Sequence, residues 1–129
     1  MITTDIQPDM VVHTGRDEVS LSQITEAMQA WYQHDEFDPE LPVLWDLRDI
    51  SPDLSWVRLP ETELSDWSSY NLSLINAQRA GRKTAWIFAN SELAEFAVDL
   101  LGASDWQHRV RIFNDDMEAA VAWLTSTIK

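Results

Sequence analysis

The chain has no cysteine and only three glycines among its 129 residues. Without cysteine there is no disulfide framework, no thiolate nucleophile and no cysteine-ligated metal. Loops that cradle a phosphate need closely spaced glycines, and a serine nucleophile elbow needs Gly-x-Ser-x-Gly. Neither pattern occurs, and there is no His-Glu-x-x-His sequence. These absences argue against the common nucleotide-binding, hydrolase and zinc-protease motifs, and we expect no metal and no cofactor.

Positive charge is also scarce, because nine lysine and arginine side chains stand against 22 aspartates and glutamates, a net charge of −13. The imbalance lies in residues 1–66, which hold 15 acidic and three basic side chains, whereas residues 67–129 hold seven and six. Such a surface repels phosphate backbones, so we expect no nucleic-acid partner. A solvated face that maintains solubility is the favoured explanation, and a docking surface for a basic partner is the alternative.

Long apolar runs are missing as well. No segment reaches the roughly 18 apolar residues of a membrane span, and the first residues do not resemble a signal peptide. We therefore expect no membrane insertion and a cytoplasmic location. The hydrophobic fraction of 45%, with seven tryptophans, is enough to build a core. The length fits a single domain over residues 1–129.

The most informative segment is residues 41–49, with the sequence LPVLWDLRD. It begins as a continuous apolar run and ends in Asp46, Arg48 and Asp49. An apolar run of this length is typical of a strand that is buried on both faces of a parallel sheet. Residues 84–89, TAWIFA, form a second such run. We expect residues 43–47 and 84–89 to be adjacent, parallel and central strands.

Shorter β-rich segments flank these two strands. Residues 10–14 predict a strand that ends in turn chemistry at residues 15–17, and residues 2–6 could pair with it as an edge strand, although Pro8 would limit that pairing. Residues 109–113 alternate between basic and apolar side chains, which indicates an edge strand or a strand with one wet face.

Four amphipathic helices are predicted between and after the strands, at about residues 21–33, 60–80, 91–101 and 116–128. Capping boxes begin the first and last of them, formed by Ser20 with Gln23 and by Asp115 with Glu118. Strands that alternate with helices favour parallel pairing through right-handed crossovers. The predicted fold is a single α/β domain with a mostly parallel sheet of four to five strands and helices on both faces.

Polar side chains gather where three of these strands end, and open α/β sheets bind ligands outside the carboxyl ends of their strands. This places a candidate crevice for a ligand or partner at Asp46, Arg48, Asp49, Asn90, Ser91 and Asn114. A simpler interpretation, which these residue types favour, is that the asparagines and the serine are helix caps and that Arg48 balances its aspartates.

Candidates for chemistry are otherwise few. His13, His34 and His108 are scattered, and each is interpreted as a surface or strand-edge residue. The acidic loop at residues 34–40 lacks the glycine and the ligand spacing of an EF-hand, so it is interpreted as a solvated connection. Most tryptophans fall on apolar stripes and belong to the core. Trp56 and Trp106 fall in connections and could line a pocket or an interface, which suggests a homodimer.

The order of the segments VLWDLRD, GRKTAWIFA and RVRIF, with a terminal helix that contains AVAWL, resembles the SpoIIAA-like proteins of the STAS superfamily. The resemblance covers residues 10–124 or so. It implies a mixed sheet of four or five strands, in small bacterial proteins without known catalysis. Some relatives antagonise anti-sigma factors and are switched by serine phosphorylation, whereas others are similar to lipid-binding CRAL-TRIO domains.

The resemblance predicts a non-enzymatic module that acts through protein–protein contacts, with a regulatory role as one form of it. The alternative is a carrier of a small apolar ligand or lipid, and the most distant is a small enzyme that uses Asp46, Asp49 or His108. A phosphorylated serine would correspond to Ser51 or Ser55. The Asp-Ser-Ser-Gly surroundings of such a serine are absent here, and the acidic residues that follow disfavour a phosphate.

Overall fold

A computed structural model describes residues 1–50, 63, 66–67, 70, 83–101 and 110–126, with the side chains of residues 97–101 excepted. Its elements are β1 (Ile2–Ile6), β2 (Val11–Asp17), α1 (Leu21–Tyr32), β3 (Val43–Ile50), β4 (Thr84–Phe88), α3 (Ser91–Leu101), β5 (Val110–Asn114) and α4 (Met117–Thr125).

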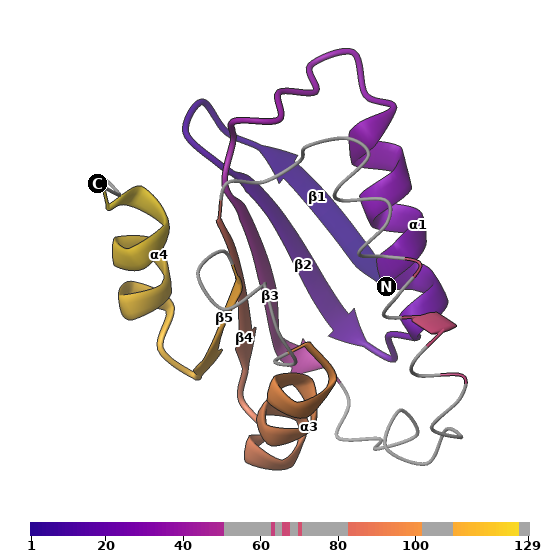
Figure 1. Ribbon diagram of the computed structural model, residues 1–129, viewed down its shortest axis with the longest axis vertical. Helices are drawn as coiled ribbons and strands as arrows, with labels where there is room; N and C mark the ends of the chain where they lie inside the picture. Colours follow the sequence, from indigo (N-terminus) through magenta and orange to yellow (C-terminus); the bar gives the residue numbers. More distant parts are fainter. Residues whose placement is uncertain (51–62, 64–65, 68–69, 71–82, 102–109, 127–129) are drawn as a thin grey trace.

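The five strands form one sheet in the order β1-β2-β3-β4-β5 (Figure 1). The pair β1–β2 is antiparallel, and the other three pairs are parallel. Strand β3 lies in the middle and β4 beside it, with Val43 opposite Thr84 and Leu47 opposite Phe88. The prediction of two adjacent, parallel, inner strands is confirmed, as is the mostly parallel α/β sheet.

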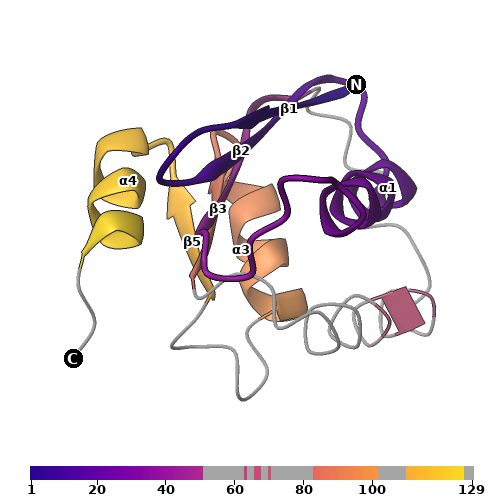
Figure 2. The ribbon, with the colours of Figure 1, turned by 90° about the horizontal axis from the view of Figure 1, so that it is seen from above.

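Helices lie on both faces of the sheet, as predicted (Figure 2). On one face, α1 and α3 cover a core that includes Val43, Trp45 and Leu47 of β3. On the other face, α4 packs through Ala120 and Leu124 against a core that includes Leu44. Successive residues of a strand point to opposite faces, so a strand covered on both sides must be apolar at consecutive positions. This requirement explains the uninterrupted run that begins β3.

The predicted pairing of residues 2–6 as an edge strand is confirmed, but the expected effect of Pro8 is wrong. Strand β1 pairs with β2 along its whole length, from Ile2 opposite Gly15 to Ile6 opposite Val11. Pro8 does not limit this pairing, because it lies in the tight connection that the Gln7 N–H closes by donating to the Met10 carbonyl over 2.9 Å. The fixed φ of proline suits such a turn.

The predicted turn at residues 15–17 is also wrong, because β2 continues through it to Asp17. Gly15 serves a close approach instead: a Cβ at this position would lie 2.7 Å from Cδ2 of Leu47. The register of β2 and β3 shifts beside Gly15, since Thr14 faces Asp46 and Arg16 faces Asp49. One residue of β2, Gly15, thus lies opposite two residues of β3, Leu47 and Arg48. This is a β-bulge in β3.

The helix starts are set by side-chain caps. Ser20 and Gln23 form the predicted capping box of α1, whose stripe of Leu21, Ile24, Met28 and Trp31 is buried. The predicted cap of α4 is displaced by one residue: Asp116, and not Asp115, accepts the Ala119 N–H over 2.9 Å. Asp115 instead adopts a positive φ of 55° and donates its N–H to the Phe88 carbonyl. Asp tolerates this left-handed conformation better than most residues.

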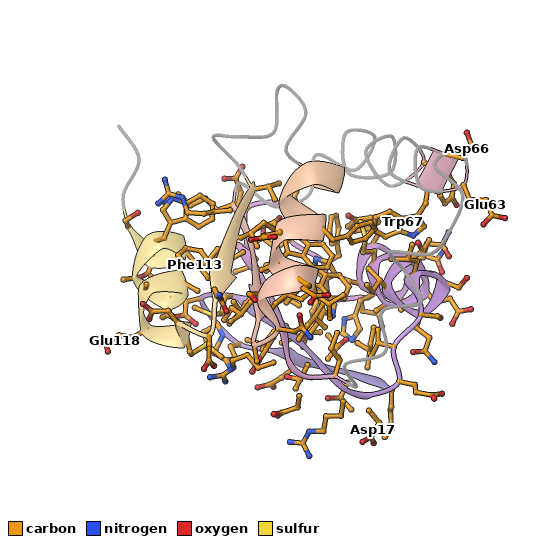
Figure 3. The ribbon with its side chains drawn as sticks, turned by 90° about the horizontal axis from the view of Figure 1, so that it is seen from below. Asp17, Glu63, Asp66, Trp67, Phe113 and Glu118 are labelled. Carbon is orange, nitrogen blue, oxygen red and sulfur yellow. The ribbon has the colours of Figure 1, made fainter. Side chains whose placement is uncertain are left out.

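Of the helix predicted at residues 60–80, the structure describes Glu63, Asp66, Trp67 and Tyr70, and all four are helical. The Trp67 Nε1–H donates to the Leu21 carbonyl over 3.1 Å and to the Thr25 hydroxyl over 2.9 Å, which ties this segment to α1. Figure 3 shows Trp67 turned towards α1, with Glu63 and Asp66 at the periphery. The rest of this predicted helix lies outside the described residues.

The carboxyl end of α4 is held by Lys83, which precedes β4 and is buried. Its ammonium donates to the Trp123 carbonyl over 2.6 Å, and to the Ser126 carbonyl and hydroxyl over 3.1 and 2.6 Å. A cation at a helix carboxyl terminus satisfies free carbonyls and opposes the negative end of the helix dipole. This contact fixes α4 against the sheet.

A row of side chains crosses the face of the sheet beneath α1 and α3. Thr4, His13, Trp45 and Trp86 occupy paired positions on four successive strands. The rings of Trp45 and Trp86 are stacked, with centroids 4.8 Å apart and an interplanar angle of 4°, and the His13 ring lies 4.1 Å from Trp45. The Thr4 hydroxyl and His13 Nδ1 are 2.8 Å apart. The expectation of a surface or strand-edge position for His13 is therefore wrong, since its exposure is 1%.

Truncating Leu47 tests the buried centre of the sheet. Leu47 is 1% exposed, so Leu47→Ala should lower the free energy of unfolding by about 2–5 kcal/mol through loss of contacts and formation of a cavity. Leu41→Ala is the matched control, because Leu41 precedes the same strand and is half-buried. Chemical denaturation would measure both, and a midpoint for Leu47→Ala equal to that of the control would contradict the assignment.

Acid should destabilise the fold through His13. Burial lowers the pKa of His13 from 6.5 to about 4, so the unfolded chain takes up this proton first. Neutral His13 therefore makes its full contribution to the free energy of unfolding above pH 6.5. This contribution is lost as the pH falls towards 4, and the loss amounts to roughly 3 kcal/mol. We expect a smaller loss of stability over this range in His13→Gln, measured by denaturation at each pH. An NMR titration in which His13 protonates near pH 6.5 would contradict its neutral, buried state.

Candidate functional site

The charged end of β3 contains a two-point ion pair between Asp46 and Arg48. Arg48 Nε donates to Asp46 Oδ1 over 2.9 Å, and a terminal guanidinium nitrogen donates to Oδ2 over 2.9 Å. The Arg48 backbone N–H adds a bond of 3.3 Å to Oδ1. The Asp46 side chain is 11% exposed and that of Arg48 is 33% exposed. Such fork-to-fork pairs are directional and are stronger than single contacts.

The pair fixes the charge state of Asp46. Burial alone would raise the pKa of this carboxyl, but the hydrogen bonds from the side chain and backbone of Arg48, together with the charges of Arg48 and Arg16, hold the pKa below its ordinary value. The hydrogen bond to Asp46 likewise raises the pKa of the Arg48 guanidinium. A carboxylate that is ionised and accepts hydrogen bonds at both of its oxygens is poorly placed to act as a general acid or base.

Three further charges surround this pair. Asp49 and Asp115 lie close enough to Arg48 to favour its cation, and Arg16 favours the anion of Asp46. Arg16 also faces Asp49 in the register of β2 and β3. We call these residues the carboxyl-edge cluster: Arg16, Asp46, Arg48, Asp49 and Asp115. It connects β2, β3 and the β5–α4 connection by charge.

The sequence favours Arg48 as the balancing charge for its neighbouring aspartates, and the structure confirms this for Asp46. The predicted site residues do not include Arg16 and Asp115, because the sequence indicates a turn at Arg16 and a helix cap at Asp115. The signal that could have found them is their position at the ends of strands that neighbour β3.

The other three residues of the predicted crevice are Asn90, Ser91 and Asn114, and the structure gives them positions at the ends of α3 and β5. Asn90 Oδ1 accepts the N–H groups of Glu92 and Leu93 over 2.9 and 3.2 Å, so Asn90 caps α3. Ser91 begins α3, and Asn114 ends β5 opposite Phe88. Within the described residues, no hydrogen bond joins them to Asp46 or Arg48. Their role in binding a ligand stays a prediction.

The remaining candidates give no second site within the described residues. His34 is exposed and accepts the Glu36 N–H at Nδ1 over 3.0 Å. No group of three or more histidines, aspartates and glutamates is arranged to hold a metal ion in the part of the chain that the structure describes. His108, Ser51, Ser55, Trp56 and Trp106 lie outside that part.

None of the described helices combines the length and apolar character that crossing a membrane requires. Comparisons of the chain with models of protein families, with curated proteins and with solved structures find no match.

Replacing Arg48 separates a structural pair from a binding site. If the pair serves the fold, Arg48→Ala should cost about 1–3 kcal/mol, because it leaves a largely buried carboxylate without its main partner. The melting temperature should fall by several degrees while any bound partner is retained. Arg16→Ala is the control, because Arg16 is exposed and acts on Asp46 only through space. An Arg48→Ala protein that melts like the wild type but no longer binds its partner would identify a binding site instead.

Proposed function

We propose that this domain is a SpoIIAA-like module of the STAS superfamily that has no catalytic activity and acts through contacts with another protein. The single observation that carries the proposal is the closed ion pair at the end of β3. An open α/β sheet presents its reactive groups at this edge. Here Asp46 and Arg48 satisfy each other over two bonds of 2.9 Å, so neither is free to act as an acid or base on a substrate, which favours action through contacts with another protein.

The buried histidine supports the same conclusion. A general base needs access to its substrate and a pKa near the working pH. His13 is 1% exposed, its Nδ1 is paired with the Thr4 hydroxyl, and burial lowers its pKa to about 4. Its function is to pack against Trp45. An enzyme that uses Asp46, Asp49 or His108 stays the least favoured of the three functions, because Asp46 is held in its ion pair with Arg48 and His108 lies outside the described residues.

A carrier for a small apolar ligand or lipid, of the CRAL-TRIO type, is the second candidate. Such a carrier needs a cavity between the helices and the sheet. In the described part of that space, the stacked rings of Trp45 and Trp86 and the side chain of Leu93 pack into one core. This filling favours contact at the surface over storage in the interior. A switch by phosphorylation of Ser51 or Ser55 is one form that the regulatory role could take.

Affinity purification of the tagged protein from the cells that produce it, followed by native mass spectrometry, distinguishes these functions. We expect a second protein chain in a fixed ratio to this one. We also expect the mass of this chain, once released from its partner, to be the same in native and denaturing spectra, because no small molecule is bound to it. The matched bait is Leu47→Ala, which controls for capture of unfolded protein. A small apolar molecule that is present in the native spectrum and lost on denaturation would support the carrier and overturn the proposal.

A further inference from the structure

Strand β1 leaves one side of its backbone without a strand partner in the described structure. It lies at the edge of the sheet, beside β2 only (Figure 1). Its central residues Thr3, Thr4 and Asp5 are exposed, while Ile2 and Ile6 are half-buried. An edge strand of this kind is a template on which another extended chain can pair.

The register identifies the backbone groups that face outwards. Arg16 donates its N–H to the Met1 carbonyl and Gln7 donates to the Met10 carbonyl, each over 2.9 Å. In an antiparallel pair, residues that point their N–H and C=O groups at the partner strand alternate with residues that point them away. Met1 and Gln7 point inwards, so Thr3 and Asp5 do as well. The N–H and C=O groups of Ile2, Thr4 and Ile6 therefore face the open edge.

The side chains at this edge divide between the two faces of the sheet. Ile2 packs against the core beneath α1, and the alternation of the strand places Thr4 and Ile6 on the same face. Thr3 and Asp5 are on the opposite face, where the Asp5 carboxylate accepts only a Gln7 side-chain N–H, over 3.0 Å, among the described contacts. A strand beside β1 would thus meet two isoleucines that flank Thr4 on one face and the Asp5 carboxylate on the other.

The charge around this edge selects the partner. Residues 1–50, the described segment that contains β1, hold 11 acidic side chains and two basic side chains, Arg16 and Arg48, a net charge of −9. The Met1 amine beside β1 is occupied by the carbonyls of Arg16 and Glu18, 2.9 and 2.8 Å away. A second copy of the chain would bring another −13 to the contact, whereas a basic segment would be attracted to it.

We propose that β1 accepts an extended basic segment of a partner protein as an additional strand of the sheet. This inference rests on the proposed function, because it names the surface and the class of partner through which the domain acts. The backbone groups of Ile2, Thr4 and Ile6 supply the hydrogen bonds. The alternation of the edge specifies apolar residues on the α1 face of the segment and lysine or arginine beside Asp5 on the other.

Amide hydrogen exchange with a defined peptide tests the proposal. The probe is a short capped peptide in which lysine alternates with valine, and its control is the peptide in which glutamate replaces lysine. In the free domain, we expect slow exchange at the Thr3 and Asp5 amides and fast exchange at Ile2, Thr4 and Ile6. The lysine peptide should slow exchange at these three positions, whereas the glutamate peptide should leave them fast.

Two substitutions address the backbone and the charge separately. Thr4→Pro removes an outward N–H without removing a bond to β2, and should weaken binding of the lysine peptide roughly tenfold or more. Thr4→Val is its matched control, because it also loses the hydroxyl contact with His13 but keeps the N–H. Asp5→Asn should weaken binding about two- to fivefold and reduce its salt dependence. Since Asp5 is exposed, this variant keeps the test decisive if Thr4→Pro does not fold.

Each other outcome overturns the inference in a distinguishable way. Equal binding of both peptides would remove the role of charge. Protection of Ile2, Thr4 and Ile6 that rises with protein concentration, without peptide, would identify a second copy as the occupant. If the partner captured from cells binds Thr4→Pro and Thr4→Val equally well, the proposed function stands but the edge is not its surface. If no protein partner is captured by any bait, the proposed function itself fails.

Discussion

The rest of the structure depends on the burial of β3 on both faces. A strand in this position must be covered from two directions, and each cover recruits a different part of the chain. One cover is α1 with α3, and the other is α4. The stacking of Trp45 on Trp86 then fixes β4 beside β3, and the contact of Trp45 with His13 fixes β2 on the other side. The hairpin partner β1 is joined to this arrangement through Thr4, so a single constraint at the centre extends to the edge of the sheet.

The same strand explains why the carboxyl edge is charged but closed. An apolar strand of this kind ends where its cover ends, and the groups that follow must be polar. Asp46 is still largely buried, and an ionised carboxylate there is stable only with a close cation. Arg48, two residues later on the same strand, supplies that cation over two short bonds. The charged residues that follow the apolar run of β3 suggest a binding site in the sequence. The same residues are also what the end of a buried strand requires.

Much of the fold could be predicted because its signals are local. The apolar runs of β3 and β4, the box formed by Ser20 and Gln23, and the stripe of α1 each depend on neighbouring residues. The errors depend on distant ones. Gly15 looked like a turn residue, since nothing near it in the sequence indicates that Leu47 lies against it. His13 looked polar and exposed, since Thr4 and Trp45 surround it only after three strands have paired. The ion pair in the candidate site was accessible to sequence reasoning, because both partners lie on one strand, whereas Arg16 and Asp115 come from other elements.

The bulge in β3 has a consequence for how the gene can vary. In a regular strand, Leu47 and Ile50 would point to opposite faces, because they are three positions apart. With the extra residue opposite Gly15, both pack on the side of α1. The bulge thus resets the inside–outside phase of the strand. Deletion of one codon at the bulge would leave Leu47 and Ile50 two positions apart, so both would stay on the side of α1 in a regular strand. Deletion of one codon between Val43 and Leu47 would instead move the residues before it to the opposite face relative to those after it, so a one-residue deletion in this strand should be tolerated best at the bulge.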